Sequence, residues 1–190
     1  MIKIGILGDI GSGKSYVAQS FGHPVFDADR EVSKLYKTDK KTFNELKKIL
    51  PDYFDKFPIE KKKVLEAILD KKGNLKKIVK IIHKEIRKKM SVFLKKNSHK
   101  KIVILDIPLL LENKINNKNF ILIYVQSKKS ETLKRLKKRK NFNQKLFRKF
   151  KKIQLPLDYK KKKSNFIIKN DFNKVTVQKY VKDITKEILR

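Results

Sequence analysis

The chain has 190 residues, of which 51 are lysine or arginine and 19 are aspartate or glutamate, so its formal net charge is +32. This length predicts one domain with a hydrophobic core of its own. The absence of cysteine excludes a disulfide framework and thiol catalysis. No N-terminal signal and no apolar run of membrane-spanning length is present, so we expect a soluble, cytoplasmic protein without a membrane partner.

A charge of this size suggests a nucleic-acid partner. The excess is nearly all lysine, however, and it is scattered along the chain rather than set in one stripe. Arginine, which is better suited to reading bases, is scarce. Asparagine is abundant as well, and an A+T-rich coding sequence would produce such a joint excess. We therefore expect non-specific adhesion to polyanions and no specific nucleic-acid partner.

The first predicted element is a buried parallel strand, Ile2 to Leu7, that leads into a phosphate-binding loop. Residues 8–15 read GDIGSGKS and match the P-loop pattern G-x-x-x-x-G-K-[ST]. Glycines let the backbone aim its N–H groups at an anion, and the helix over Tyr16 to Phe21 points its positive end there. Lys14 would reach the outer phosphates, and the Ser15 hydroxyl would bind Mg²⁺. The alternative is a glycine-rich turn with a solvated lysine.

A brief apolar run, Val25-Phe26, predicts the end of a second strand. It brings Asp27 and Asp29 to the carboxyl edge of the sheet, where parallel sheets bind their ligands. Side chains two apart on an extended segment point in opposite directions, so one carboxylate can face the site while the other caps the helix Arg30 to Tyr36. The alternative is that both carboxylates only cap the helix and face solvent.

Residues 38–100 are predicted to form helices and loops. The helical spacings cover Thr42 to Leu50, Glu60 to Leu69 and Leu75 to Leu94. Asn74 is the predicted N-cap of the last of these helices. His83 lies beside its apolar stripe, where a lone histidine is more often structural than catalytic.

The segment Lys101 to Asp106 reads KIVILD and predicts an apolar strand that ends in an acid. In P-loop proteins such an acid can hold Mg²⁺ directly or through water. Pro108 ends the strand, and Glu112 closes the following PLLLE segment. A further strand is predicted over Phe120 to Val125.

A very basic helix is predicted over Ser127 to Lys140. Arg135 and Arg139 lie four positions apart and share one face of that helix, either as a solvated cationic face or as a pair of forks for triphosphate oxygens. The remaining predicted elements are the helix Lys145 to Gln154, a break at Pro156, a lysine run from Lys160 to Lys163, the strand Asn165 to Lys169 and the helix Val175 to Leu189. Alternating strands and helices predict an α/β fold with a mostly parallel sheet.

From Ile2 to about Asn170, the chain resembles the dephospho-coenzyme A kinases. The residues that carry the resemblance are GDIGSGKS, the DAD of residues 27–29, IIHKEIRKKM around His83, DIPLLLE of residues 106–112, the R-x-x-x-R pair and NFIIKN. The resemblance implies a P-loop kinase-type doubly wound parallel sheet flanked by helices. It implies a single domain over residues 1–190, with a helical substrate-binding subdomain at residues 38–100 and a lid at residues 128–160.

The resemblance also implies the activity: transfer of the γ-phosphoryl group of ATP, with Mg²⁺, to the 3′-hydroxyl of the ribose of dephospho-coenzyme A, in a monomer. Asp29 would be the general base, Lys14, Arg135 and Arg139 would complete the catalytic set, and Asp27 and His83 would lie on the acceptor side. Mg²⁺ would be held by Ser15 and Asp106. The nucleotide-binding residues would be Gly8, Gly11, Ser12, Gly13, Lys14, Ser15 and Tyr16.

Two positions depart from the family pattern. Asp9 stands where the family usually has glycine, and because a carboxylate beside a polyphosphate is unfavourable, we expect Asp9 to face solvent. His83 is followed by Lys84 rather than by proline, which loosens the local backbone. Two alternative functions stay open: a P-loop kinase for another nucleoside or nucleotide, and a nucleotide-regulated nucleic-acid-binding module.

Overall fold

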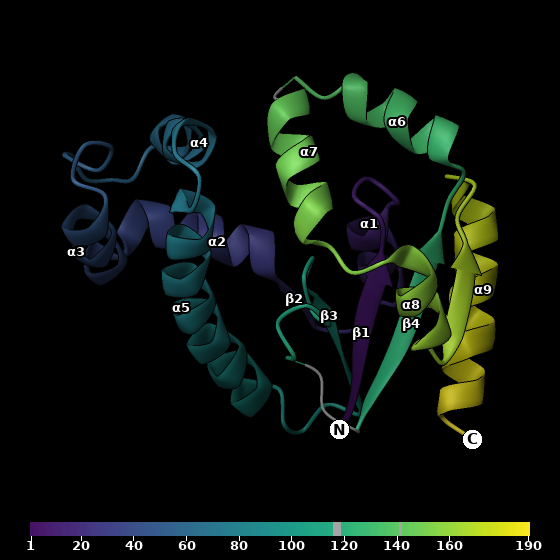
Figure 1. Ribbon diagram of the computed structural model, residues 1–190. Coiled ribbons are helices and arrows are strands. Elements are labelled where there is room, and N and C mark those ends of the chain that lie inside the picture. Colours follow the sequence, from purple (N-terminus) through teal and green to yellow (C-terminus); the bar gives the residue numbers. More distant parts are fainter. Residues whose placement is uncertain (116–118, 141) are drawn as a thin grey trace.

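The computed structural model describes residues 1–115, 119–140 and 142–190. Its centre is a parallel sheet whose strands lie in the order β2-β3-β1-β4-β5, with helices on both faces (Figure 1). The strands are β1 (Ile2–Gly8), β2 (Val25–Asp27), β3 (Ile102–Asp106), β4 (Phe120–Gln126) and β5 (Phe166–Lys169). The predicted doubly wound P-loop kinase fold is therefore confirmed.

Successive residues of the central strands enter two separate hydrophobic cores. Ile4 and Ile6 of β1 pack into the core formed with α1 (Lys14–Ser20) and α9 (Lys174–Ile188). Leu7 faces the opposite core, which is formed with the helices between β2 and β3. Because β1 pairs with β3 on one side and β4 on the other, its carboxyl end lies in the middle of the sheet edge.

Four helices connect β2 to β3: α2 (Ala28–Thr38), α3 (Lys40–Ile49), α4 (Lys61–Asp70) and α5 (Asn74–Lys96). The apolar stripe predicted for α5 is buried at Ile78, Ile82 and Ile86. The predicted capping role of Asn74 is wrong, since Gly73 caps the helix with φ 103°. Asn74 is instead the first helical residue, and its buried Nδ2 donates to the Ala67 carbonyl at 2.9 Å, which ties α5 to α4.

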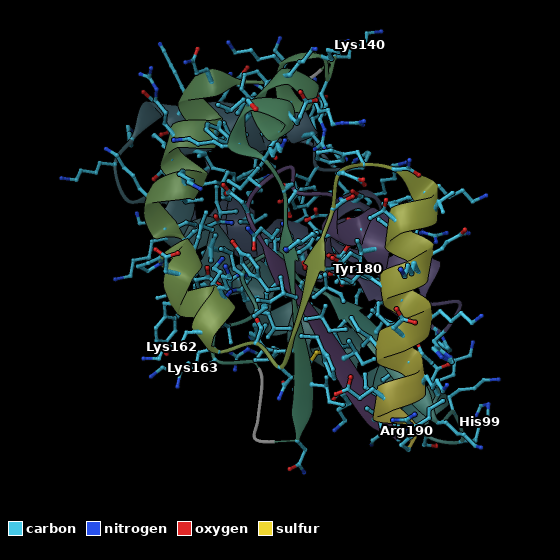
Figure 2. The ribbon with its side chains drawn as sticks, turned by 90° about the vertical axis from the view of Figure 1, so that its right-hand side faces the viewer. His99, Lys140, Lys162, Lys163, Tyr180 and Arg190 are labelled. Atoms are coloured by element: carbon cyan, nitrogen blue, oxygen red, sulfur yellow. The ribbon has the colours of Figure 1, made fainter. Side chains whose placement is uncertain are left out.

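The cationic side chains are spread over the surface rather than gathered in one stripe. Figure 2 shows nitrogen-tipped side chains projecting from several sides of the molecule, with Lys140 at the top and Lys162 and Lys163 at the lower left. This distribution agrees with the scatter of lysine along the sequence. No helix in the described ranges is both long and apolar enough to cross a membrane.

The segment after β4 passes over the carboxyl edge of the sheet as α6 (Lys129–Lys137) and α7 (Gln144–Ile153), and then returns along one face of the sheet as α8 (Leu157–Lys162), which packs against β1 (Figure 1). The helix predicted up to Lys140 ends earlier, at Lys137, so Arg139 lies beyond it. The lysine run at 160–163 begins inside α8, a short helix that the sequence did not predict.

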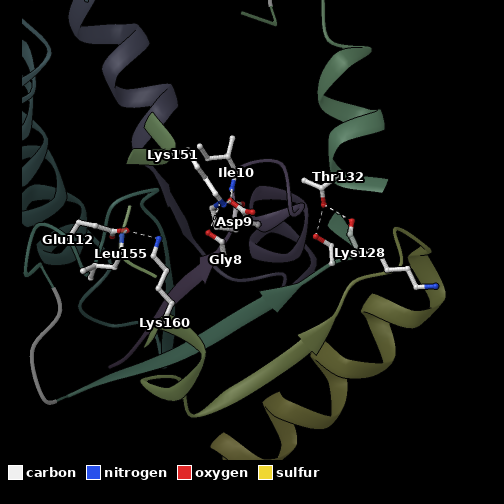
Figure 3. A network of polar contacts seen from close by, with 11 residues as sticks. Gly8, Asp9, Ile10, Glu112, Lys128, Thr132, Lys151, Leu155 and Lys160 are labelled. Carbon is white, nitrogen blue, oxygen red and sulfur yellow. Dashed lines mark hydrogen bonds and ion pairs between the residues drawn. The ribbon is translucent and has the colours of Figure 1, made fainter. Parts of the chain in front are cut away.

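Lys160 of that run is not a surface residue. Its side chain is 1% exposed, and its Nζ lies 2.6 Å from Oε1 of Glu112, which is 9% exposed (Figure 3). The same Glu112 oxygen accepts the N–H of Leu155 at 3.0 Å. Glu112 thus attaches both α8 and the chain before it to the segment that follows β3.

Replacing Lys160 by methionine should lower the free energy of unfolding by about 3 kcal/mol, because Glu112 would keep a buried charge without its partner. Urea denaturation measures this change. Lys161→Met is the matched control, since Lys161 is exposed on the same helix. Equal stabilities of the two variants would show that the buried pair does not contribute to the fold.

Candidate active site

The P-loop connects β1 to α1 and needs glycine at two crowded positions. Gly11 has φ 80° and Gly13 has φ 89°, in the left-handed region that side chains disfavour. A Cβ at Gly11 would lie 2.7 Å from Cγ of Leu136 on α6. A Cβ at Gly13 would collide with the Asn170 side chain. Helix α6 and the end of β5 therefore pack directly against the loop backbone.

Asn170 joins the end of β5 to the P-loop. It is 3% exposed, and its Nδ2 donates to the Ser12 carbonyl at 2.8 Å, while its Oδ1 accepts the N–H of Phe172 at 2.9 Å. The sequence interpretation gave Asn170 no role. Its position at the carboxyl end of the last predicted strand was the signal that could have identified it.

The Lys14 side chain forms hydrogen bonds within the loop. Its Nζ donates to the Asp9 carbonyl at 2.7 Å and to the Gly8 carbonyl at 3.4 Å. Burial lowers the pKa of Lys14, and the charge of Asp106 counteracts that effect. Ser12 Oγ is buried in the same loop and has no hydrogen-bond partner among the residues that the structure describes, so a phosphate oxygen would satisfy it. Ser15 and Tyr16 are exposed at the start of α1.

The predicted carboxylates meet at the carboxyl edge of β2 and β3, where Asp27 and Asp106 are register partners. Asp27 caps α2, since its Oδ1 accepts the N–H of Arg30 at 2.9 Å. Asp29 lies in the first turn of α2 and lines the main cavity. The division into one capping and one site-facing carboxylate is as predicted. It arises because the helix begins at Ala28, so the predicted extended segment with opposed side chains is wrong.

The charged groups in this region shift one another's pKa values. Loss of solvent raises the pKa of Asp29, the Asp27 carboxylate raises it further, and the cations of Lys14 and Arg139 act in the opposite direction. Burial also raises the pKa of Asp106, which is 5% exposed, whereas a hydrogen bond with Ser15 and the charge of Lys14 lower it. Asp29 and Lys14 are thus close enough to interact electrostatically.

The oxygens of Ser15 and Asp106 are of the kind that binds Mg²⁺ beside a nucleotide. Mg²⁺ usually keeps several waters and takes one or two protein oxygens together with substrate phosphates. The described residues contain no group of three or more His, Cys, Asp or Glu that could hold a metal ion. The Ser15–Asp106 pair matches a site completed by phosphates.

A cavity of about 540 Å³ extends from the P-loop to α5. Its lining is mostly apolar and comes from α2, α5, the segment after β3 and the α6–α7 region. Polar groups from Asp29, His83, Asn113 and Arg139 enter it. Burial lowers the pKa of His83, the nearby Arg87 lowers it further, and a hydrogen bond with Asn113 raises it. This volume suits a small organic ligand.

The two predicted lid arginines do not share one face. Arg139 lines the cavity near Asp29, whereas the Arg135 guanidinium lies 4.1 Å from the ring centre of Phe172. The prediction assumed an uninterrupted helix, but α6 ends between the two residues. Residue 141 of the predicted lid lies outside the described residues.

Asp9 does not simply face solvent, so that expectation is wrong. Its side chain is 23% exposed, and its Oδ1 lies 2.6 Å from Nζ of Lys151 on α7 (Figure 3). The sequence gave no signal for this partner, because Lys151 is one of many lysines in a basic segment.

Comparisons with known proteins agree with the arrangement. The family model described as dephospho-CoA kinase matches residues 2–176. A dephospho-CoA kinase of Wolbachia pipientis wMel is 32% identical over 190 residues, covering 97% of both chains. One from Bartonella henselae is 30% identical over 192 residues, covering 98% of both. The structure of dephospho-CoA kinase from Campylobacter jejuni superimposes with a TM-score of 0.63 at 23% identity, covering 99% of this chain and 98% of that one.

Asp29→Asn should raise the stability of the folded protein at pH 7. Because the pKa of Asp29 is higher in the folded than in the unfolded chain, ionisation of this carboxyl costs stability as the pH rises. The advantage of the variant should shrink as the pH falls through the raised pKa of the folded state and disappear below about 3, where the carboxyl is protonated in both states. Urea unfolding across this pH range checks it, with Asp183→Asn, an exposed site on α9, as control. A stability gain that did not change with pH would contradict the prediction.

Proposed function

This chain belongs to the dephospho-CoA kinase family, and we propose that it phosphorylates the 3′-hydroxyl of the ribose of dephospho-CoA, with ATP as donor and Mg²⁺ as cofactor. The observation that carries the proposal is the position of Asp29. Asp29 lines the cavity and lies close enough to Lys14 of the P-loop to interact with its charge, so one carboxylate would serve both the acceptor and the phosphates.

The P-loop would hold the donor. Its backbone N–H groups and Lys14 would contact the β- and γ-phosphates, and Ser12 Oγ would gain the partner it lacks. Ser15 and Asp106 would hold Mg²⁺ with the phosphates, and the ion would supply charge neutralisation between them. Gly11, Gly13 and Tyr16 would shape the nucleotide side of the loop.

The acceptor would occupy the cavity, with Asp29 oriented at the ribose hydroxyl. The hydroxyl oxygen forms a bond to the γ-phosphorus, the bond from that phosphorus to the β–γ bridging oxygen breaks, and ADP leaves. Asp29 accepts the hydroxyl proton, and its raised pKa favours that role near neutral pH. Asp27 and His83 would contribute to the acceptor side, Asp27 by fixing the start of α2 and His83 by contact from α5.

Residues 128–160 would act as the lid and residues 38–100 as the substrate-binding subdomain. Arg139, already in the cavity, would stabilise charge on the transferred group. Arg135, stacked on Phe172, would act from the nucleotide side. Closure of the lid would exclude water, which otherwise competes with the acceptor for the γ-phosphoryl group. A monomeric, cytoplasmic enzyme remains our expectation.

An acceptor panel tests the function directly. The purified protein receives ATP and Mg²⁺ with dephospho-CoA, or with nucleosides and nucleoside monophosphates, and kcat/KM is measured for each. We expect dephospho-CoA to be the preferred acceptor. A higher kcat/KM for any other compound would replace the proposal with a kinase of that acceptor, and sequence-selective nucleic-acid binding at physiological salt would favour the binding module.

Two substitutions separate the proposed roles. Asp29→Asn should lower kcat far more than it changes the Kd for ATP, since Asp29 acts on the acceptor. Lys14→Ala should lower kcat by about 100-fold or more, the usual loss for one group that stabilises transition-state charge. Steady-state kinetics and ATP titration measure these effects. Near-wild-type kcat in Asp29→Asn would remove Asp29 from the role of base.

A further inference from the structure

An ion pair joins the P-loop to α7, and none of the roles above uses it. Oδ1 of Asp9 accepts the N–H of Ile10 at 2.7 Å and lies 2.6 Å from Nζ of Lys151 (Figure 3). The two paired residues are 142 positions apart. Their side chains are 23% and 39% exposed, so the pair is partly shielded from solvent.

Asp9 puts a negative charge inside the loop that should receive a triphosphate. Its backbone carbonyl accepts the Lys14 ammonium at 2.7 Å, and its carboxylate acts on the charge of Lys14. An unpaired carboxylate at this place would repel phosphate oxygens. The Lys151 ammonium lies directly on the carboxylate and offsets that repulsion.

Polar contacts, together with the packing of Leu146 on the core, hold helix α7 above the site. None of its residues is fully buried. Lys149 donates to the carbonyls of Ile68 and Leu69 at the end of α4, and Lys151 pairs with Asp9. These two lysines attach α7 to the substrate side and to the P-loop, and the cavity lies between these attachments.

We propose that Lys151 is a positioning residue for ATP, which neutralises Asp9 in the P-loop and holds α7 over the phosphate site. The inference rests on the proposed function only in taking a nucleoside triphosphate as the ligand of the loop. Loss of Lys151 exposes the Asp9 charge to the phosphates, so the damage depends on Asp9 being charged. Removing both charges removes the repulsion between Asp9 and the phosphates and also the ammonium that offsets it.

A double-mutant cycle tests the proposal through the Kd for ATP at constant Mg²⁺, measured by calorimetry. Lys151→Met should weaken ATP binding by about tenfold, within the usual range for coupled charged groups. The same change in the Asp9→Asn background should weaken it by less than about threefold. Asn keeps the acceptor for the Ile10 N–H and removes only the charge. Lys152→Met, at an exposed position on α7, is the matched control and should bind ATP as the wild type does.

Adenosine separates an electrostatic role from a structural one. Its affinity should be equal in all variants, because it carries no phosphate charge. Equal losses of ATP affinity in both Asp9 backgrounds, equal losses for ATP and adenosine, or an equal loss in Lys152→Met would each overturn the proposal. Lys151→Gln gives the same comparison if Lys151→Met does not fold.

The acceptor panel distinguishes a failure of this inference from a failure of the proposed function. Coupling between Asp9 and Lys151 in a protein that does not phosphorylate dephospho-CoA would sustain the inference and reject the function. Phosphorylation of dephospho-CoA without such coupling would do the reverse.

Discussion

The rest of the structure depends on the close approach of other segments to the P-loop backbone. Leu136 of α6 packs where a side chain at Gly11 would project, and Asn170 at the end of β5 fills the space beside Gly13. Asn170 also bonds the Ser12 carbonyl. The loop conformation is therefore set by the segments that follow β4 and β5, on one side of β1, since the strands are parallel and their carboxyl ends meet at one edge.

The same edge concentrates charges that oppose stability. Loss of solvent disfavours the charged forms of Asp29, Asp106 and Lys14, which lie close enough to act on one another. Each shift in pKa has the sign that burial produces, and the opposite charges only partly offset it. Sites that prepare groups for proton and phosphoryl transfer commonly carry such a cost, because the unfolded chain solvates these groups better.

A few lysines of this very basic chain make specific structural contacts that the composition does not reveal. Lys160 is buried against Glu112, Lys149 bonds the end of α4, and Lys151 pairs with Asp9. All three lie in α7, which lines the cavity, and in α8, which follows it along the chain. Charge-assisted contacts therefore hold this segment together with the apolar packing of Leu146 and Leu157 on the core.

The sequence by itself determined the P-loop, the buried parallel strands, the pair of carboxylates after the second strand and the family, because each of these is encoded within a short segment or by its spacing. It could not determine the partners of Asp9, Glu112 and Ser12. Their partners Lys151, Lys160 and Asn170 lie far along the chain, among residues of the same type that face solvent. The separation of Arg135 from Arg139 also required the fold, since α6 ends between them and the helical spacing ceases to apply. The local sequence pattern specifies the elements and motifs. Which lysine among many pairs with a given carboxylate is decided only by tertiary packing, because packing brings the two side chains together and shields them from water.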